Sequence, residues 1–499
     1  MKRESIFPAS LVAAAAFLRL WRLRQMEFKG DERESIELGL RLLRERPWTS
    51  AASWPRVGLP SSGGIDNPPF YDWLMALFWQ VTGSPLGCTA LIALANVLAL
   101  PAIYLWARRA VGPARALVVL GWLALSPYAV IYSRKLWPPE LLLPGVALLV
   151  WGVERWRAGS YWLGAGLMLW ASLFFTHLHL SGSVFMAVLA VTLVADLIRR
   201  ARAGQLPPLA RPRWWEALLA AAGLGVMAFF TVPYLRYLAT LSPGTLAAGM
   251  RLAWPEPQLL FRLTNAVVPL ELEGHFGGHW SQLVRARSPN ALWWILRWIG
   301  LFGAIYTAIP LALRGAYGWM RRPSAVPILG LAWIGFLLLF SLLQLPAFTQ
   351  YVLVMFPLPA LLIAGAFDPE ENVAPARGWT WLRWAHVGLL GILSASTIVW
   401  VTGRGGSEGD YGVGYDCQYR QARAVIAALK KEDPSRFETA PRSAFSGGCH
   451  PLEHEVRWIA RWLAPELDAR MNGVRLCEGW LADGKGDVQY RWAVDRTSL

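Results

Sequence analysis

The chain is poor in charged residues. Asp, Glu, Lys and Arg make up 16% of its 499 residues, whereas a soluble globular domain has about 25%. The sequence also lacks an internal repeat, a low-complexity tract and the small-residue cleavage site of a signal peptide, so the first apolar segment is expected to remain as an anchor. These absences argue against a soluble protein and against a cleaved leader.

Apolar sequence is abundant instead. Hydrophobic residues make up 55% of the chain, and the mean hydropathy is +0.35. Recurrent apolar runs of roughly 18–25 residues are typical of membrane-spanning helices, because a helix satisfies all its backbone groups internally in hydrocarbon. The predicted fold class is an α-helical polytopic membrane protein with about eleven transmembrane helices. They are expected near residues 6–20, 86–107, 114–132, 138–154, 161–179, 182–198, 215–238, 291–312, 325–345, 350–366 and 384–402.

Basic residues predict the orientation of these spans. If the N-terminus is cytoplasmic, most arginines that flank helices fall on the inside, and the short outside connections carry only Arg134 and Lys135. This distribution follows the positive-inside rule. The net charge of +15 is largely explained by these arginines, so no nucleic-acid partner is expected.

The predicted organisation has two parts. Residues 1–402 form the transmembrane domain, with outer loops at 21–85 and 239–290. Residues 403–499 form a small extracytoplasmic α/β domain, the tail. Cys417, Cys449 and Cys477 all lie in the tail. Two of them are expected to pair in an oxidising compartment, although the sequence leaves open which two.

Two interfacial helices are expected in the first outer loop. Residues 31–46 place Ile36, Leu40 and Leu43 at helical spacing opposite charged side chains, which is typical of a helix lying along the membrane surface. Residues 69–82 are apolar but contain Asp72. They are interpreted as a second interfacial helix, with a short membrane span as the alternative.

The acidic pair Asp31–Glu32 lies where the chain leaves the first apolar segment. A carboxylate at a membrane surface can take the proton of an attacking hydroxyl in sugar transfer. One carboxylate suffices when the leaving group is a lipid phosphate, whereas glycosidases need two because their leaving group is an alcohol. The alternative is that the pair merely stabilises a helix N-terminus.

Two further segments stand out near the predicted outer face. In Asn67-Pro68-Pro69-Phe70-Tyr71 the prolines fix the backbone where a helix begins. In Tyr132-Ser133-Arg134-Lys135 the basic residues break the positive-inside pattern. They are candidates to stabilise a phosphate leaving group, or else they reach toward lipid headgroups.

The order of these motifs resembles the GT-C superfamily of lipid-dependent glycosyltransferases, in particular family 39, the protein mannosyltransferase-like and aminoarabinose transferase-like enzymes. The resemblance covers about residues 1–370 and implies Asp31 as the catalytic base and Glu32 as the second acid. Asn67 stands where the family's His-Pro-Pro-Leu-Tyr stretch has His. Lys135 replaces the acid of the family's Ser-Arg-Glu segment.

The resemblance also implies the remaining site residues. Arg134, Lys135 and Tyr351 are expected to bind the donor phosphate. Some superfamily members use a divalent cation, for which Glu271, His275 and His279 are weak candidates, and no other cofactor is expected. The residues expected to shape the loop or the substrate site are Asn67, Pro68, Pro69, Tyr71 and His177.

The implied function is a glycosyltransferase at the outer face of the cytoplasmic membrane. It would move a sugar, with inversion, from a polyprenyl-phosphate-linked donor to an acceptor lipid, glycan or protein. The main alternative is a lipid-linked-sugar transporter or flippase without catalysis. Transporters, however, carry ionisable residues near the bilayer midplane and paired repeats, neither of which is visible. A lipid-linked-oligosaccharide ligase would share the topology but not the early Asp-Glu pair.

Overall fold

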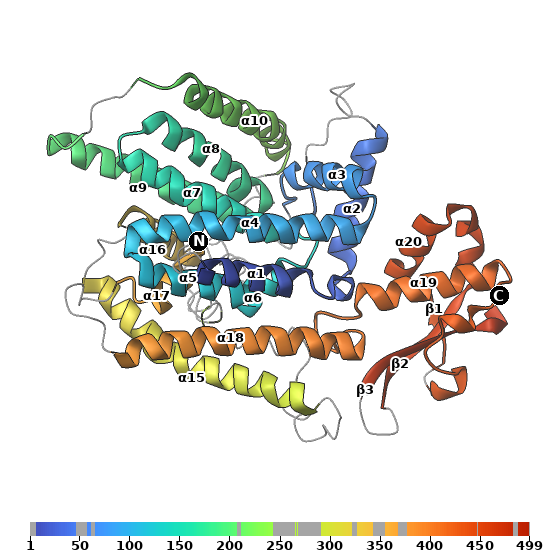
Figure 1. Ribbon diagram of the computed structural model, residues 1–499. Coiled ribbons are helices and arrows are strands. Elements are labelled where there is room, and N and C mark those ends of the chain that lie inside the picture. Colours follow the sequence, from blue (N-terminus) through green and yellow to red (C-terminus); the bar gives the residue numbers. More distant parts are fainter. Residues whose placement is uncertain are drawn as a thin grey trace.

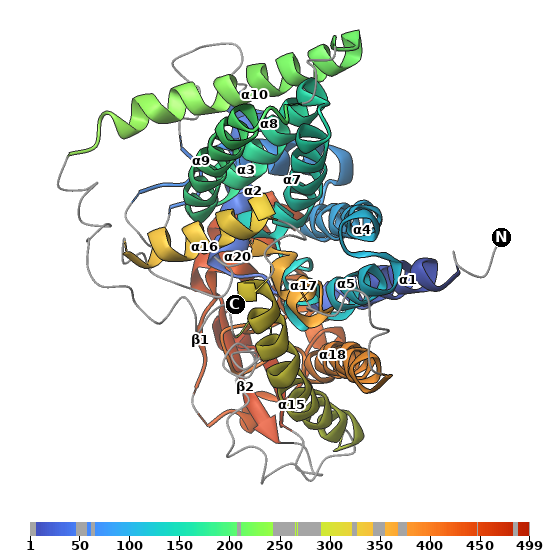
Figure 2. The ribbon, with the colours of Figure 1, turned by 90° about the vertical axis from the view of Figure 1, so that its left-hand side faces the viewer.

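The computed structural model is a bundle of helices, most of which run roughly along one axis, with a mixed helix-and-strand region at one end (Figure 1). It describes residues 6–45, 57–60, 65–206, 211–242, 265, 267, 291–321, 327–342, 355–367, 377–446, 448–482 and 488–498. Viewed along the bundle, α5 and α17 lie near the centre, with α7 to α10 on one side and α15 and α18 on the other (Figure 2).

The bundle helices of the first half of the chain are α1 (Ile6–Leu20), α4 (Pro85–Val111), α5 (Pro113–Leu125), α6 (Pro127–Tyr132), α7 (Leu142–Arg157), α8 (Tyr161–Leu178), α9 (Leu180–Arg202) and α10 (Trp214–Leu238). The second half adds α15 (Ala291–Arg321), α16 (Pro327–Leu342), α17 (Leu358–Ile363) and α18 (Arg377–Arg404). Between α1 and α4 lie the short η2 (Leu23–Gln25), α2 (Gly30–Glu45) and α3 (Phe70–Thr82).

Helical structure lies within every expected span. Five described helices are long and apolar enough to cross a membrane: Pro85–Val111, Ser181–Arg202, Trp214–Leu238, Ile295–Trp319 and Arg377–Arg404. The polytopic helical fold class is therefore confirmed, while the count of about eleven spans stays a prediction. Two expected spans are interrupted at prolines: 114–132 divides into α5 and α6 at Pro127, and 138–154 begins with η5 (Pro138–Leu141) before α7.

A buried arginine stabilises the break between α5 and α6. Pro127 cannot continue the hydrogen-bond ladder of α5, so carbonyl groups at the end of α5 lack helical partners. The guanidinium of Arg19, which is fully buried, donates to the carbonyl oxygens of Leu123 and Ala124, both at 2.9 Å. In an apolar bundle these donors replace the water that would satisfy the carbonyls elsewhere.

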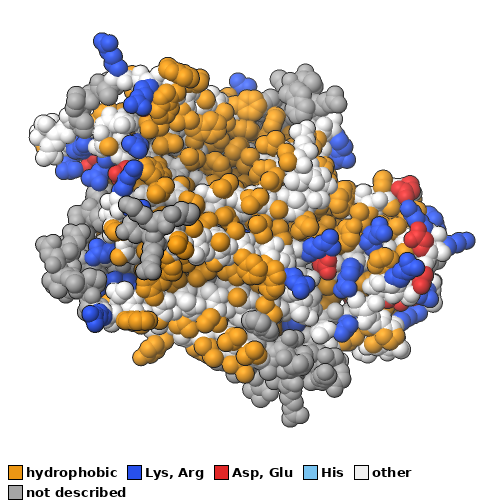
Figure 3. Space-filling model, viewed as in Figure 1, with side chains coloured by type: hydrophobic (Ala, Val, Ile, Leu, Met, Phe, Trp, Pro, Cys, Tyr) orange, Lys and Arg blue, Asp and Glu red, His pale blue; other side chains and the backbone are white. Residues whose placement is uncertain are grey.

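The surface of the bundle is apolar where a lipid bilayer would surround it. Leu98, Val191 and Leu313 are 73%, 71% and 67% exposed. Figure 3 shows hydrophobic side chains across the middle of the molecule, with Lys and Arg gathered at the left-hand end and again over the tail. An apolar belt of this extent suits hydrocarbon rather than water. The chain is a multi-pass membrane protein.

Basic residues cluster at the end of the bundle opposite the tail. The last turns of α4, α7 and α9 are rich in arginine, and the ends of α7 and α9 touch, because Arg200 donates to the carbonyl of Arg157 at 3.1 Å. The predicted inside charges on α4, α7 and α9 therefore share one end of the bundle, as the orientation requires. Which compartment that end faces stays a prediction.

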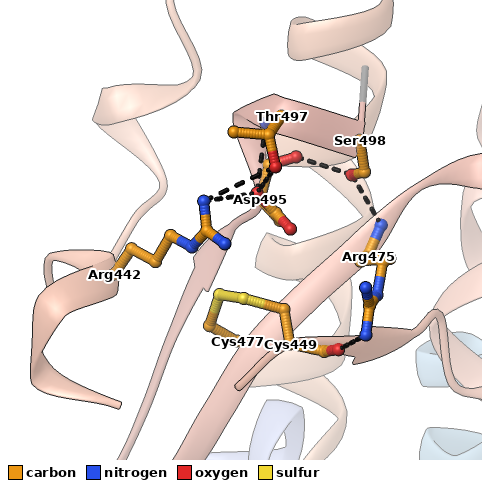
Figure 4. Close-up of a disulfide and its surroundings, with 7 residues drawn as sticks. All are labelled: Arg442, Cys449, Arg475, Cys477, Asp495, Thr497 and Ser498. Carbon is orange, nitrogen blue, oxygen red and sulfur yellow. Dashed lines mark hydrogen bonds and ion pairs between the residues drawn. A yellow bond between two sulfur atoms is a disulfide. The ribbon is translucent and has the colours of Figure 1, made fainter. Parts of the chain in front are cut away.

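The tail is a small α/β unit. Its antiparallel sheet consists of β1 (His450–Pro451), β2 (Arg475–Ala482) and β3 (Val488–Val494), in the order β1-β2-β3. Helix α19 (Tyr415–Leu429) packs on β3, and α20 (His454–Leu463) packs against α19. His450 pairs with Leu476, which places the neighbouring Cys449 opposite Cys477. These two cysteines form a disulfide (Figure 4), and Cys417 is a buried free thiol. The expectation of one bridge and one thiol is confirmed.

The tail shares a hydrophobic core with the first outer loop. Phe28 and Ile36 belong to the same cluster of buried side chains as Val456 and Ile459 of α20. The ring of Trp79 on α3 lies 5.7 Å from that of Trp462. The division at residues 402 and 403 stays a prediction, because α18 continues to Arg404 and the core crosses the boundary.

Candidate active site

The acidic pair occupies the first turn of α2, which lies across the tail end of the bundle (Figure 1). The buried residues of this helix are Glu32, Ser35, Ile36, Gly39 and Leu42. Their spacing follows one face of a helix, so Glu32 points inward with 1% exposure whereas Asp31 is exposed. The expected amphipathic helix is present. Leu40 and Leu43 are only half-buried, which shows that the buried face is rotated slightly from the expected one.

Glu32 belongs to a buried network of ion pairs. The ammonium of Lys135 lies 2.9 Å from Glu27 and 3.2 Å from Glu32. The ammonium of Lys29 lies 2.8 Å from Glu27, and its backbone N–H donates to Glu32 at 2.9 Å. Both carboxylates are 1% exposed, and buried charges of this kind persist only when paired.

The network shifts the pKa of its members. Burial raises the pKa of Glu32, and Lys135 partly opposes this rise. Burial alone would lower the pKa of Lys135, but the carboxylates of Glu27 and Glu32 overcome it and hold the pKa well above its usual value. Lys135 therefore carries a positive charge at neutral pH and lies between two carboxylates.

Glu27 and Lys29 were not singled out in the sequence analysis. The local signal was weak, since charged residues on either side of Phe28 are ordinary in a loop. Their partners come from distant segments: Glu27 and Lys135 are 108 residues apart in the chain.

Arg134 holds the end of α1. Its guanidinium is 6% exposed and donates to the carbonyl oxygens of Leu18 at 2.8 Å, Trp21 at 2.7 Å and Arg22 at 3.0 Å. These carbonyls follow or close the last turn of α1, where helical partners end. The charges of both Arg134 and Lys135 thus face protein groups in this structure, and their phosphate-binding role stays a prediction.

The proline segment forms a tight loop at the start of α3. The backbone N–H and the side-chain amide of Asn67 donate to the carbonyl of Leu59 at 2.9 and 3.0 Å. Pro68 and Pro69 are buried, and α3 begins at Phe70, directly after Pro69. The segment therefore fixes where α3 starts, as the proline pair predicts.

This loop contacts the ends of α8 and α10. Phe70 packs against His177 with ring centroids 6.4 Å apart, and His177 shares a 2.9 Å hydrogen bond with Thr231. Tyr234 donates to the carbonyl of Asp66 at 2.8 Å. Asn67, Pro68, Pro69, Tyr71 and His177 consequently lie together at the end of the bundle where α2 packs on α3.

Several buried polar atoms lack hydrogen-bond partners among the described residues, and two of the groups concerned lie near this loop. They are the hydroxyl of Tyr71 and the carboxyl group of Glu140 on η5. Glu140 is 3% exposed and lines a cavity of about 20 Å³, which has room for roughly one water molecule. The other polar side chains on this cavity are Asn96, Tyr128, Tyr132 and Ser133. In the sequence, the one sign of Glu140 was its position near the start of the expected span 138–154.

Four predicted site residues lie outside the described residues: Tyr351, Glu271, His275 and His279. Within the described part of the chain, no group of three or more His, Cys, Asp or Glu side chains is arranged to hold a metal ion. The metal candidates stay a prediction.

Part of the chain matches a known protein family. Residues 66–209 match the family described as dolichyl-phosphate-mannose-protein mannosyltransferase. Over these residues the chain is similar to a family of GT-C membrane glycosyltransferases. The match spans the proline segment, Arg134, Lys135 and His177, and it confirms the resemblance drawn from the sequence.

Solved structures show weaker similarity. ArnT from Cupriavidus metallidurans in the apo state has 15% identity and a TM-score of 0.48, covering 91% of this chain and 84% of that one. ArnT of the same organism bound to undecaprenyl phosphate has 14% sequence identity and a TM-score of 0.46, with the same coverage of both chains. The oligosaccharyltransferase of Archaeoglobus fulgidus in the apo form has 14% sequence identity and a TM-score of 0.43. The match covers 92% of this chain and 64% of that one. No curated protein matches the sequence. The similarity to a known family therefore rests on residues 66–209.

Proposed function

We propose that this glycosyltransferase moves a sugar from a polyprenyl-phosphate-linked donor to an acceptor hydroxyl, with Asp31 as general base. The observation that carries the proposal is the contrast between two adjacent carboxylates. Glu32 is buried and paired with Lys135, whereas the exposed Asp31 side chain has no hydrogen-bond or ion-pair partner among the described residues. A base must be open to the acceptor and free of a competing cation, and only Asp31 of the two meets both conditions.

The proposed reaction is a single inverting displacement. The acceptor oxygen attacks the anomeric carbon as Asp31 takes its proton, and the bond between that carbon and the phosphate oxygen breaks. The electron pair leaves with the lipid phosphate, which is stable as an anion and needs no general acid. The family description, which names dolichyl phosphate mannose as a donor, supports a polyprenyl-phosphate sugar.

Glu32 has a supporting role in this proposal. Its contacts with Lys135 and with the N–H of Lys29 fix the first turn of α2, on which Asp31 stands. Arg134, Lys135 and Tyr351 remain candidates for the donor phosphate. For Arg134 and Lys135 that role requires an exchange of their present partners when the donor binds.

The proposed setting follows from the charge pattern. The end that carries Asp31 and the tail faces the exterior of the cytoplasmic membrane, opposite the arginine-rich helix ends. The acceptor is a lipid, glycan or protein that reaches this face. A divalent cation held by Glu271, His275 and His279 belongs to the same proposal.

Transfer of labelled sugar from a polyprenyl-phosphate donor by purified, reconstituted protein tests this function. Asp31→Asn keeps the side-chain shape and should lower turnover about 10²–10⁴-fold, with donor binding nearly unchanged. Glu45→Gln is the matched control, because Glu45 is an exposed carboxylate at the other end of α2, and it should leave turnover unchanged. Near-normal turnover by Asp31→Asn would refute the base. Transport of the lipid-linked sugar without transfer would favour the flippase alternative.

A further inference from the structure

The segment that leads into α2 is bound along its length by the tail. The backbone N–H of Tyr415 donates to the carbonyl of Met26 at 3.0 Å, and the side-chain amide of Gln418 donates to the carbonyl of Phe28 at 3.0 Å. Glu27 forms an antiparallel bridge with Gly414. Between η2 and α2 the chain thus pairs with a segment almost 390 residues further on.

Side chains strengthen this contact. The ring of Phe28 lies 5.2 Å from that of Tyr415 and 5.7 Å from that of Trp458. The ammonium of Lys29 binds the backbone carbonyl and the carboxylate of Asp410, the latter at 3.3 Å. Phe28 is fully buried, so the tail covers its side chain as well as donating hydrogen bonds to the backbone.

The contact continues toward Asp31. Phe28 is followed by Lys29, whose N–H donates to Glu32 and whose ammonium binds Glu27. Residues 26–29 form no helix of their own, so their position depends on these partners. A displacement of Phe28 is therefore transmitted through Lys29 to the first turn of α2.

We infer that the tail is a positioning element of the active site, and that Gln418 and Asp410 hold Asp31 in place through Phe28 and Lys29. This inference rests on the proposed role of Asp31. A general base must be held to within a fraction of an ångström, and a shift of about 1 Å can cost about 10²-fold in rate. The tail does not touch the substrate in this account.

Helix α19 offers a matched pair of variants. Gln418 and Gln421 are both buried, at 3% and 1% exposure, and both donate a hydrogen bond from the side-chain amide. Gln418 donates to Phe28 of the first loop at 3.0 Å and, at 3.4 Å, to Val413 of the tail. Gln421 instead donates within the tail, to Glu478 and Tyr490. Gln418→Met and Gln421→Met therefore disturb the tail to a similar degree, but only the first releases the loop.

The experiment measures kcat, the donor KM and thermal unfolding for both variants in the full-length reconstituted protein. Gln418→Met should lower kcat about tenfold, because even a small displacement of a general base slows the reaction, with the donor KM unchanged. Gln421→Met should leave kcat unchanged. It should lower the unfolding temperature by about as much as Gln418→Met does. Equal losses of kcat in the two variants would overturn the inference, because they would reflect tail stability alone.

A double variant separates this inference from the proposed function. In the Asp31→Asn background, Gln418→Met should cause no further loss of rate, since it acts through Asp31. If Asp31→Asn is active, the proposed function fails first. If Asp31→Asn is inactive but Gln418→Met adds its full effect to the residual rate, only the positioning role is wrong.

Asp410→Asn tests the same inference at the surface, where the change spares folding. It should lower kcat about two- to fivefold. If neither Asp410→Asn nor Gln418→Met lowers kcat, the positioning role of the tail is refuted.

Discussion

Removal of the Lys135 charge is expected to destabilise the folded protein strongly. Lys135→Met keeps most of the side-chain volume but leaves Glu27 and Glu32, each 1% exposed, without their shared cation. Glu27 retains Lys29 at 2.8 Å, whereas Glu32 loses its ion pair at 3.2 Å and keeps only the N–H of Lys29. The unpaired charge at Glu32 is therefore the main penalty.

The magnitude follows from the burial of the pair. Breaking a buried ion pair by removing one partner costs about 3–5 kcal/mol, and because Glu27 keeps a partner we expect the lower end, about 3 kcal/mol. Lys135→Met/Glu32→Gln removes the unpaired carboxylate as well. That double variant should recover about half of the loss, which gives a clear coupling energy in a double-mutant cycle.

The penalty should also depend on pH. Burial raises the pKa of Glu32 and Lys135 holds that rise in check, so the pKa rises further when Lys135 is absent. The folded variant then takes up a proton on acidification at a pH where the folded wild type does not, and it regains stability relative to wild type. The difference in stability should therefore shrink as the pH falls below neutral.

Thermal unfolding of detergent-purified protein measures these effects, with Lys135→Arg as the control that keeps the charge. An unchanged unfolding temperature for Lys135→Met would show that the network contributes nothing measurable. A penalty that grows on acidification would contradict the assignment of the unpaired charge to Glu32.

Two further predictions concern the tail and the orientation. Cys449 and Cys477 close a loop with a sequence separation of 28 residues, so replacing both with Ala should cost about 3–4 kcal/mol of stability. Non-reducing peptide mapping should recover that pair and leave Cys417 as the thiol, whereas a bridge that includes Cys417 would contradict the register of β1 and β2. For orientation, a membrane-impermeant thiol reagent on intact cells should label Glu432→Cys in the tail and spare Arg202→Cys at the end of α9, both of which are exposed positions. The reverse pattern would refute the outward-facing site.

The helical membrane class and most helix positions were predictable because they depend on local composition. A run of apolar residues in hydrocarbon has to be helical, so Pro85–Val111 and Arg377–Arg404 follow from sequence alone. The break at Pro127 divides an expected span, because a proline removes one hydrogen bond and the distant Arg19 supplies replacement donors. The sequence pattern does not contain that partner.

The candidate site was predictable only in part. The acidic pair, the proline segment and the basic pair were found because each has a local signature. The Cys449–Cys477 pairing was not, since it depends on the register in which β1 meets β2. Nor did the sequence indicate that Arg134 faces the carbonyls at the end of α1.

By itself the sequence determined that this is a many-helix membrane protein with an acidic pair at the start of an amphipathic helix, because hydropathy and helical period act over neighbouring residues. Only the tertiary structure decided that Glu32 turns inward to Lys135 while Asp31 stays open, and that the tail binds the segment before them. Those choices depend on pairing among segments more than 100 residues apart. The free energy of each buried pair depends on its partner and its surroundings, which no local pattern specifies.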